Sequence, residues 1–411
     1  MWYSIFLSLC FLFVLARWRR KNKRIDAYTI LLLLYLFVAI LCVYECYICK
    51  GTIQLKVWDI STWNIKLWPM IYLFVVIILF FRPFKKYDSR HLIENLVIPQ
   101  RLEMYLSVIS VLYIIFSLIS IYYSITSFQV TISIGDYQDA YNESVDRAQY
   151  VNALDGIAKR YTDYLRPLVV FLSFYLMLIK KKKIFLSIIA LFFAFLCALM
   201  ISALNASRGG AFSAIMLLVF CLVIFWYKMP RKVKTISLVL GGSVAVFFVI
   251  YSILVTNARF EDDSISSILF YFGHSFLAFN YGIAPCLTQY SQGTYLFNWF
   301  LPFFGITPIP CLGNKVEGLF ISFVGSLYKD FGFIGTLFIA VFFPLLINRM
   351  MKPRNMHFDI ASAYIYVFFY MQMVSGVFVY GNAQGFLWFV AILIFLFLKF
   401  LVVITNSKRD H

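Results

Sequence analysis

Charged residues are scarce in this sequence. Asp, Glu, Lys and Arg make up 13% of the 411 residues, whereas hydrophobic residues make up 62%. Soluble globular domains carry about 25% charged residues, so this composition excludes an ordinary water-soluble fold. Apolar runs of about 20 residues, the length that crosses the hydrocarbon core of a bilayer, recur along the whole chain. The sequence therefore predicts an all-α polytopic integral membrane protein in which residues 1–411 form a single membrane domain.

Nucleotide-binding and hydrolase motifs are absent as well. The sequence contains no G-x-x-x-x-G-K-[ST] loop, no dinucleotide fingerprint, no G-x-S-x-G elbow and no H-E-x-x-H metal motif. Ion-coupled transporters place ionisable side chains within their spans, and only Glu45, near the end of a predicted span, approaches such a position. We therefore expect no cofactor and no metal, and a pump or a proton-coupled carrier lacks support.

The apolar runs predict about eleven transmembrane helices. Their ranges are 1–16, 27–46, 67–81, 105–128, 164–179, 184–204, 211–227, 235–256, 332–347, 358–380 and 386–405. Short clusters of Lys and Arg separate them, and such clusters are enriched in cytoplasmic loops. An N-terminus outside and a C-terminus in the cytoplasm bring all the clusters to one side. The net charge of +17 therefore reflects membrane topology and not binding to nucleic acid.

This topology predicts two long loops on the outer side. Residues 129–163 form the first loop, and residues 257–331 form a larger loop that is expected to contain interfacial or re-entrant helices. Cys286 and Cys311 share the larger loop, and their spacing leaves open whether they form a disulfide. Because the chain has almost no other soluble mass, we expect the active site in the larger loop.

Two arginines lie at the outer ends of predicted spans, where the positive-inside bias disfavours them. Arg208 stands in a tight turn before Gly209 and Gly210, and Arg259 follows a span. The glycines permit a sharp turn into the next helix, whose first amides together with a guanidinium suit phosphate oxygens. The alternatives are snorkelling for Arg208 and an ordinary ion pair with neighbouring carboxylates for Arg259.

Three titratable side chains of the larger loop are candidates for acid–base chemistry. His274 is the only histidine on the predicted outer side, and imidazole exchanges a proton near neutral pH. The alternative is a hydrogen-bonded histidine without chemistry. Glu261 begins an acidic run that a solvated loop explains better than a divalent cation site. Asp330 precedes a predicted span and suits a helix N-cap, with catalysis as the alternative.

Aromatic residues make up 20% of the chain, and most of them fit lipid-facing or interfacial positions. The larger loop is denser in Tyr and Trp, which stand beside amide side chains. Flat apolar rings next to amide donors and acceptors suit sugar rings. Asn280, Tyr281 and Trp299 are therefore candidate sugar-binding residues.

Three stretches carry a resemblance to a known family. They are residues 205–210 (NASRGG) at a span junction, residues 299–308 (WFLPFFGITP), and residues 328–335 (YKDFGFIG) at the entry to a span. Together with a long outer loop that opens with an arginine, they resemble the Wzy-type O-antigen polymerases, also called oligosaccharide repeat unit polymerases.

The resemblance implies a glycosyltransferase at the outer, periplasmic face of the bacterial inner membrane. Such enzymes move a glycan from undecaprenyl diphosphate to the terminal sugar of a new lipid-linked repeat unit. The implied partners are this lipid-linked oligosaccharide and the membrane, and a chain-length regulator is left open.

On this hypothesis Arg208 and Arg259 hold the diphosphate and stabilise its charge as it leaves. His274 acts as the base on the acceptor hydroxyl, oriented by Asp330 or by the cluster that begins at Glu261. A flippase for lipid-linked oligosaccharides and an O-antigen ligase are the alternative functions.

Overall fold

The computed structural model describes residues 2–47, 64–133, 152–204, 209–259, 272–316, 320–353, 356–378 and 384–407. In these ranges the regular elements are helices, joined by turns and two isolated β-bridges. The chain forms two compact units, which are treated separately here. The first unit comprises Met1–Ser89, Asp262–Lys352 and Gln372–Ile392; the second comprises Arg90–Glu261, Pro353–Met371 and Leu393–His411.

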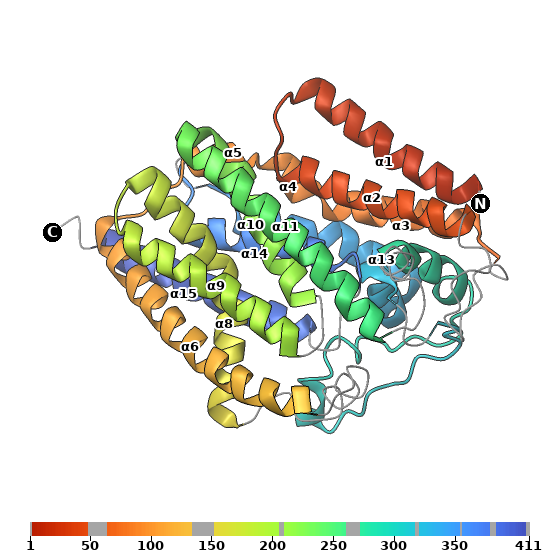
Figure 1. The fold of residues 1–411 in the computed structure, drawn as a ribbon. Helices are drawn as coiled ribbons and strands as arrows, with labels where there is room; N and C mark the ends of the chain where they lie inside the picture. The colour runs from red at the N-terminus through yellow and green to blue at the C-terminus, as the bar shows by residue number, and fades with distance from the viewer. Residues whose placement is uncertain are drawn as a thin grey trace. The chain divides into compact units, whose positions relative to one another are not determined.

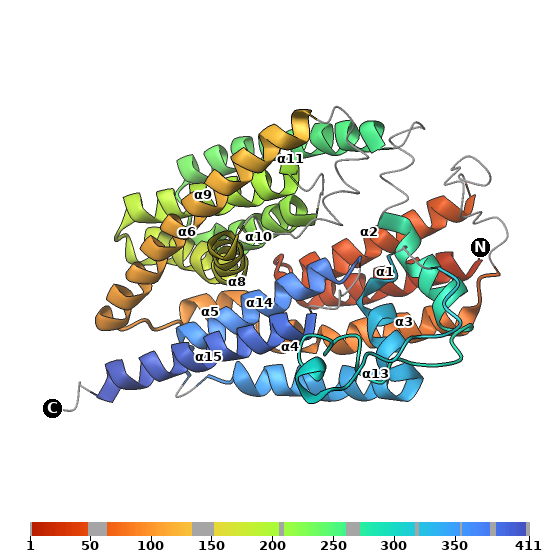
Figure 2. The ribbon, with the colours of Figure 1, turned by 90° about the horizontal axis from the view of Figure 1, so that it is seen from below.

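The first unit is built around its N-terminal helices. Helices α1, α2 and α3 lie side by side in both views, and α13 packs against α3 (Figures 1 and 2). The elements are α1 (Trp2–Lys21), α2 (Ala27–Tyr47), α3 (Leu67–Phe80), α4 (Arg82–Lys86), the π-helix η4 (Phe279–Ile283), the 3-10 helix η5 (Leu301–Phe304) and α13 (Ser322–Met350). Asp26 begins α2, because its carboxylate accepts a hydrogen bond from the Thr29 amide at 2.7 Å.

The second unit is a bundle in which α6 packs against α8 and α9, and α10 packs against α8, α9 and α11. Its elements are α5 (Ser89–Glu94), α6 (Gln100–Ser133), α8 (Ala153–Tyr175), the π-helix η2 (Leu176–Lys180), α9 (Ile184–Leu204), α10 (Gly209–Phe225), the 3-10 helix η3 (Trp226–Lys228) and α11 (Arg231–Arg259). The two last helices, α14 (Ile360–Ser375) and α15 (Gln384–Ser407), each contribute residues to both units.

The described part of the chain contains 8 helices that are long and apolar enough to cross a membrane. They are α1, α2, α6, α8 with η2, α9, α10 with η3, α13 and α15; α3 and α14 are shorter apolar helices. The predicted class, an all-α polytopic membrane protein, is therefore confirmed. Each predicted span overlaps a helix, although the exact number of spans stays a prediction, as does the single domain.

Helix α6 has the polarity of a lipid-exposed helix with a polar interior. Beyond its first turn, its exposed side chains are Met104, Val108, Val111, Leu112, Ile115, Leu118 and Ile125, together with Tyr105 and Tyr122. Its buried face carries Glu103, Ser107, Ser110, Tyr113, Ser117, Ser120 and Ser124. Lipid solvates the apolar face, so polar side chains are placed where the helix meets other helices.

Helices extend into both ends of the predicted outer loop 129–163. Helix α6 continues to Ser133, and α8 begins at Ala153. Asn152 is the N-cap of α8, since its side chain accepts a hydrogen bond from the Asp155 amide at 2.9 Å. The charged residues that resembled a loop instead occupy the first turns of a long helix.

Helix α13 also begins earlier than predicted, at Ser322. Gly332 interrupts it with φ 66° and ψ −168°, a conformation that L side chains rarely adopt. A β-carbon at Gly332 would lie 2.8 Å from the Tyr290 ring, so the close packing of Tyr290 against the helix also requires glycine at this position. The predicted span start at residue 332 thus coincides with a break inside the helix.

Candidate functional site

Several predicted site residues fall outside the described ranges. Arg208 and Glu261 belong to this group, and Arg259 is described only as the last residue of α11. Gly209 and Gly210 open α10. Their proposed contact with a diphosphate stays a prediction.

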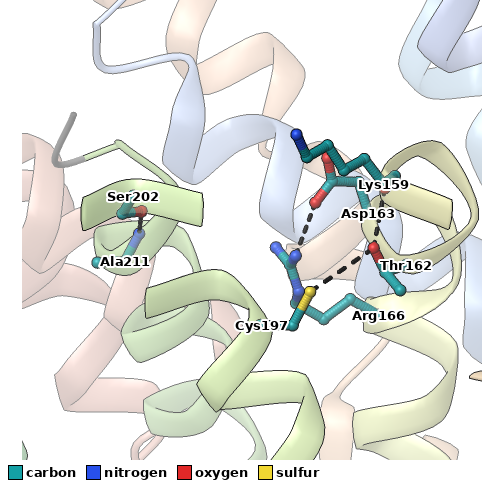
Figure 3. A network of polar contacts seen from close by, with 7 residues as sticks. All are labelled: Lys159, Thr162, Asp163, Arg166, Cys197, Ser202 and Ala211. Carbon is teal, nitrogen blue, oxygen red and sulfur yellow. Dashed lines mark hydrogen bonds and ion pairs between the residues drawn. The ribbon is translucent and has the colours of Figure 1, made fainter. Parts of the chain in front are cut away.

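The start of α10 is packed closely onto α9. A β-carbon at Gly210 would lie 2.7 Å from the Ser202 hydroxyl, so glycine permits the close approach. The same hydroxyl accepts a hydrogen bond from the Ala211 amide at 2.8 Å (Figure 3). One amide of the first helical turn is therefore satisfied within the protein and does not need an anion.

His274 lies in a short helical segment, residues 272–278, that leads into η4, and its side chain is 1% exposed. The Phe320 amide donates a hydrogen bond to its Nε2 at 3.1 Å, and the two rings stack at 5.7 Å. The segment is anchored to α2, because the Cys42 thiol donates to the Gly273 carbonyl at 2.8 Å. It is therefore a buried segment and not a solvent-facing one, and Nε2 can accept a proton only if the Phe320 amide releases it.

Asp330 is fully buried, and its carboxylate binds the main chain of another segment. The Tyr295 amide donates to Oδ1 at 3.1 Å and the Leu296 amide donates to Oδ2 at 2.8 Å. The predicted N-cap role within its own helix is therefore wrong. Burial raises the pKa of the Tyr295 hydroxyl, and the charge of Asp330 raises it further. Asp330 thus fixes the loop around Tyr295.

The candidate sugar-binding residues have different environments. The Asn280 side chain accepts from the Lys66 amide at 2.7 Å and donates to the Lys66 carbonyl at 2.6 Å, so both of its polar atoms are bound. The Trp299 ring lies between Phe386 and Phe389, with ring centroids at 5.2 Å from each, and Nε1 is buried without a hydrogen-bond partner. Tyr281 is half-buried. Trp299 therefore offers an unused donor.

Two further predictions concern cysteines and metals. Cys286 and Cys311 are both free thiols in the structure, and the Cys286 thiol donates to the Tyr281 carbonyl at 3.2 Å. Among the described residues, no group of three or more His, Cys, Asp or Glu side chains is arranged to bind a metal ion. The acidic run at Glu261 lies outside these residues.

The second unit contains a charged helix face that the sequence analysis missed. Asp155, Lys159, Asp163 and Arg166 recur every three or four residues along α8, a spacing that places them on one side. Lys159 Nζ lies 2.9 Å from Asp155 Oδ2. Arg166 Nη2 donates to Asp163 Oδ1 at 2.6 Å, as Figure 3 shows. Arg166 is only 9% exposed. A buried guanidinium in a membrane-length helix is a functional candidate by default.

The polar face of α6 lies opposite these charges. Tyr113, Ser117, Ser120 and Ser124 are each completely buried; Ser120 faces the Cys197 thiol, and the hydroxyls of Ser117 and Ser124 have no hydrogen-bond partner. The Tyr113 hydroxyl interacts electrostatically with the Arg166 guanidinium, whose Nε also lacks a hydrogen-bond partner. We call these five side chains the polar seam. It joins α6 to α8 inside the second unit.

Helix α9 closes the seam on a third side. The Cys197 thiol lies 3.9 Å from the Thr162 hydroxyl, and Ala190, Ala194 and Ala198 are buried on the same helix. Small residues at this four-residue spacing allow helices to approach closely. Figure 3 places Cys197 and Thr162 beside the Arg166 and Asp163 pair.

The seam lies well inside the length of its helices. At 1.5 Å per residue, Arg166 is about 21 Å along the helix from Lys180, and Tyr113 is about 20 Å from Gln100. A hydrocarbon core is about 30 Å thick, so both residues lie well away from the basic ends of their helices. The sequence analysis named only Glu45 as approaching such a position, and Glu45 is 1% exposed; Arg166 is a buried charge that it missed.

Helical periodicity could have revealed the seam. Tyr113, Ser117, Ser120 and Ser124 follow a spacing of three or four residues in an otherwise apolar run, which marks one polar stripe. Arg166 falls within a predicted span, but its charged neighbours were assigned to a loop.

No protein-family model, curated protein or solved structure matches the chain.

Proposed function

We propose that this chain is an oligosaccharide repeat unit polymerase of the bacterial inner membrane. It transfers a glycan from undecaprenyl diphosphate to the terminal sugar of a lipid-linked repeat unit on the outer face. The proposal includes about eleven spans, with the N-terminus outside and the C-terminus in the cytoplasm. A chain-length regulator is an additional candidate partner.

The observation that carries this proposal is the buried guanidinium of Arg166 in a membrane-length helix, next to the unsatisfied hydroxyls of α6. A lipid-linked donor presents a diphosphate near the membrane surface, and guanidinium groups bind phosphate oxygens well. The sequence lacks the usual nucleotide-binding motifs, which agrees with a donor that arrives activated in the lipid phase. The three stretches that resemble Wzy-type polymerases point in the same direction.

The reaction needs charge stabilisation at the leaving group. The bond between the anomeric carbon of the donor sugar and the diphosphate oxygen breaks, and the bonding electrons leave with the diphosphate. The acceptor hydroxyl forms the new bond to that carbon and gives its proton to a base. We assign Arg166 to stabilising the developing charge, with Arg208 and Arg259 as further candidates.

His274 stays the candidate base in this proposal, with Asp330 and Glu261 as candidates for orienting it. The hydrogen bond from the Phe320 amide to Nε2 has to break for this role. Asp330 acts through the loop that it holds around Tyr295. Asn280, Tyr281 and Trp299 remain candidates for contact with sugars.

The experiment is the pattern of surface polysaccharide in a strain that lacks this protein. We expect single repeat units on the surface without the protein, and long chains after complementation with the wild type. Complementation with Arg166→Ala is expected to give single units or very short chains, and Arg166→Lys to give intermediate chains because it keeps the charge but loses the planar fork. Long chains in the strain without the protein would refute the polymerase.

Transport of the same lipid-linked oligosaccharide is a second candidate, because charged side chains are buried within membrane-length helices. Glu45 is 1% exposed, Glu103 is 5% exposed and Arg166 is 9% exposed. Such residues mark substrate or ion pathways in transporters. Lipid-linked units that accumulate on the cytoplasmic side would identify a flippase. An O-antigen ligase would differ again, because its loss leaves no repeat units attached at the surface.

A further inference from the structure

We infer that the hydroxyls of α6 form a track for the sugar hydroxyls of a lipid-linked oligosaccharide, with the phosphate group bound at the Arg166 end. The inference rests on the proposed function and specifies how the substrate lies in the second unit. It assigns the four hydroxyl groups of Tyr113, Ser117, Ser120 and Ser124 to ligand binding, and it assigns the Arg166 guanidinium to the phosphate.

Two of the hydroxyls need partners that the protein does not supply. Tyr113, Ser117, Ser120 and Ser124 are 0% exposed; Tyr113 faces the Arg166 guanidinium and Ser120 faces the Cys197 thiol, whereas the hydroxyls of Ser117 and Ser124 have no hydrogen-bond partner. Buried polar groups are normally paired, so each such group calls for water, a ligand or another explanation. The four hydroxyls follow one another on one face of α6. Together with the Arg166 Nε–H, which has no hydrogen-bond partner, they form a continuous line of hydrogen-bonding groups.

Two other serines of the same helix do not share this property. The Ser110 hydroxyl donates to the Leu106 carbonyl at 3.1 Å, and the Ser107 hydroxyl donates to the Glu103 carbonyl at 2.6 Å. Both are buried, as the seam serines are. Serine used only as a small packing residue commonly bonds back to its own helix in this way. Ser117 and Ser124 therefore differ from Ser107 and Ser110 in the same helix.

The order of the groups along the helix fits a substrate with one charged end. The Tyr113 hydroxyl interacts with Arg166, and Ser124 lies about 16 Å further along α6. The charged end suits phosphate, because a guanidinium donates to its oxygens. Hydroxyls both donate and accept hydrogen bonds, which matches the hydroxyl groups of sugars. The track thus combines an anion site with a polyol site.

Helix α8 has a weak point beside the track. Pro167 lies inside the helix directly after Arg166, and proline has no amide hydrogen for the helical bond to the Asp163 carbonyl. The first part of α8 can therefore bend away from α6 with fewer main-chain bonds to break. Such a movement would open the buried seam to a substrate.

Binding to the purified full-length protein in detergent tests the anion end. The probes are undecaprenyl phosphate, undecaprenol and inorganic phosphate, and binding is measured by native mass spectrometry. We expect undecaprenyl phosphate to bind more tightly than undecaprenol, and Arg166→Ala to weaken it about ten- to hundredfold. Equal binding of undecaprenyl phosphate and undecaprenol would overturn the anion site. Inorganic phosphate that binds without the lipid and competes with undecaprenyl phosphate at Arg166 would identify a free-anion site and overturn the lipid assignment.

The sugar end is tested with undecaprenyl-diphosphate-linked oligosaccharide against undecaprenyl diphosphate. We expect the double variant Ser117→Ala/Ser124→Ala to bind the glycan-bearing lipid about five- to tenfold more weakly and the bare lipid as the wild type does. Ser110→Ala, on the same helix, is the matched control and is expected to bind both lipids normally. An unchanged preference for the glycan-bearing lipid in the double variant would mean that only water occupies the track.

Complementation separates this inference from the proposed function. If the wild type does not restore long surface chains, the polymerase is wrong. If the wild type restores them and Ser117→Ala/Ser124→Ala restores them equally, the function stands and the hydroxyl track is wrong. We expect shorter chains from the double variant and normal chains from Ser110→Ala.

Discussion

One polar cluster in each unit uses its hydrogen-bonding atoms in the opposite way. In the first unit, Asp330, Asn280 and His274 each bind main-chain groups of a segment distant in sequence. In the second unit, Ser117 and Ser124 are buried just as deeply, yet their hydroxyls lack a hydrogen-bond partner. Burial alone therefore does not distinguish a structural polar residue from a candidate binding residue. The distinction depends on whether the polar atoms of the side chain already have hydrogen-bond partners in the protein.

The difference has a physical basis in the cost of unpaired groups. A buried donor or acceptor without a partner costs about 1–3 kcal/mol, whereas a paired one is nearly neutral or slightly favourable. Polar residues of the first unit reduce this cost for main-chain groups in irregular segments, which helices cannot satisfy. In the seam of the second unit, by contrast, the hydroxyls of Ser117 and Ser124 satisfy no main-chain group.

The largest expected effect is on stability, from Asp330→Ala. The substitution leaves the amides of Tyr295 and Leu296 without their carboxylate acceptors. We expect a loss of about 2–6 kcal/mol, since each unpaired buried amide costs about 1–3 kcal/mol. The apparent melting temperature in detergent and the folded yield are the measurements. Asp330→Asn keeps one acceptor oxygen, so its melting temperature should lie between those of the wild type and Asp330→Ala. If Asp330→Ala melts at the same temperature as the wild type, the structural role of Asp330 is wrong.

A smaller loss is expected from Asn280→Ala, which removes both hydrogen bonds to the main chain of Lys66. Lys66 itself is exposed, so water can replace part of the interaction, and we expect about 1–3 kcal/mol. Asn280→Asp is the informative control, because its second oxygen would face the Lys66 carbonyl and repel it. If Asn280→Ala melts normally but no longer supports long surface polysaccharide chains, the result would support a role for Asn280 in sugar binding.

The predicted loss is smaller still for His274→Ala, about 1–2 kcal/mol, because one hydrogen bond to the Phe320 amide and one ring contact are removed. His274→Gln restores an acceptor and should recover most of the melting temperature. Glutamine cannot exchange a proton near neutral pH. Long surface chains made by His274→Gln would therefore eliminate His274 as the base, whereas a stable variant without long chains would support it.

The fold class could be predicted from the sequence because apolar composition and run length determine it. Each predicted span overlaps a helix, although the helix at the predicted span start of residue 332 begins earlier, at Ser322. The start of α8 was missed, because Asp155 and Lys159 made the segment look like a solvated loop. Their pairing at a four-residue spacing, with Nζ and Oδ2 2.9 Å apart, makes these charges compatible with a helix.

The candidate site was harder to predict, since residue type does not reveal which atoms are already bonded. Asn280 and Asp330 are residue types suited to chemistry, but their bonds to Lys66 and Leu296 arise from segments distant in sequence. The seam serines, by contrast, are common in membrane helices and attract no notice individually. Their importance depends on Arg166, which only the packing of α8 against α6 brings near.

The smallest stability effect is expected from Ser117→Ala, and it tests the comparison most directly. The substitution removes the desolvation penalty of a buried hydroxyl and breaks no hydrogen bond. The melting temperature should therefore stay the same or rise slightly. Ser110→Ala removes a hydrogen bond to the Leu106 carbonyl and serves as the control on the same helix. If Ser117→Ala instead melts lower than Ser110→Ala, its hydroxyl is paired in the resting protein, and the two units do not differ in the way argued. If Ser117→Ala keeps the melting temperature of the wild type but gives shorter surface chains, the Ser117 hydroxyl contributes to function and not to stability.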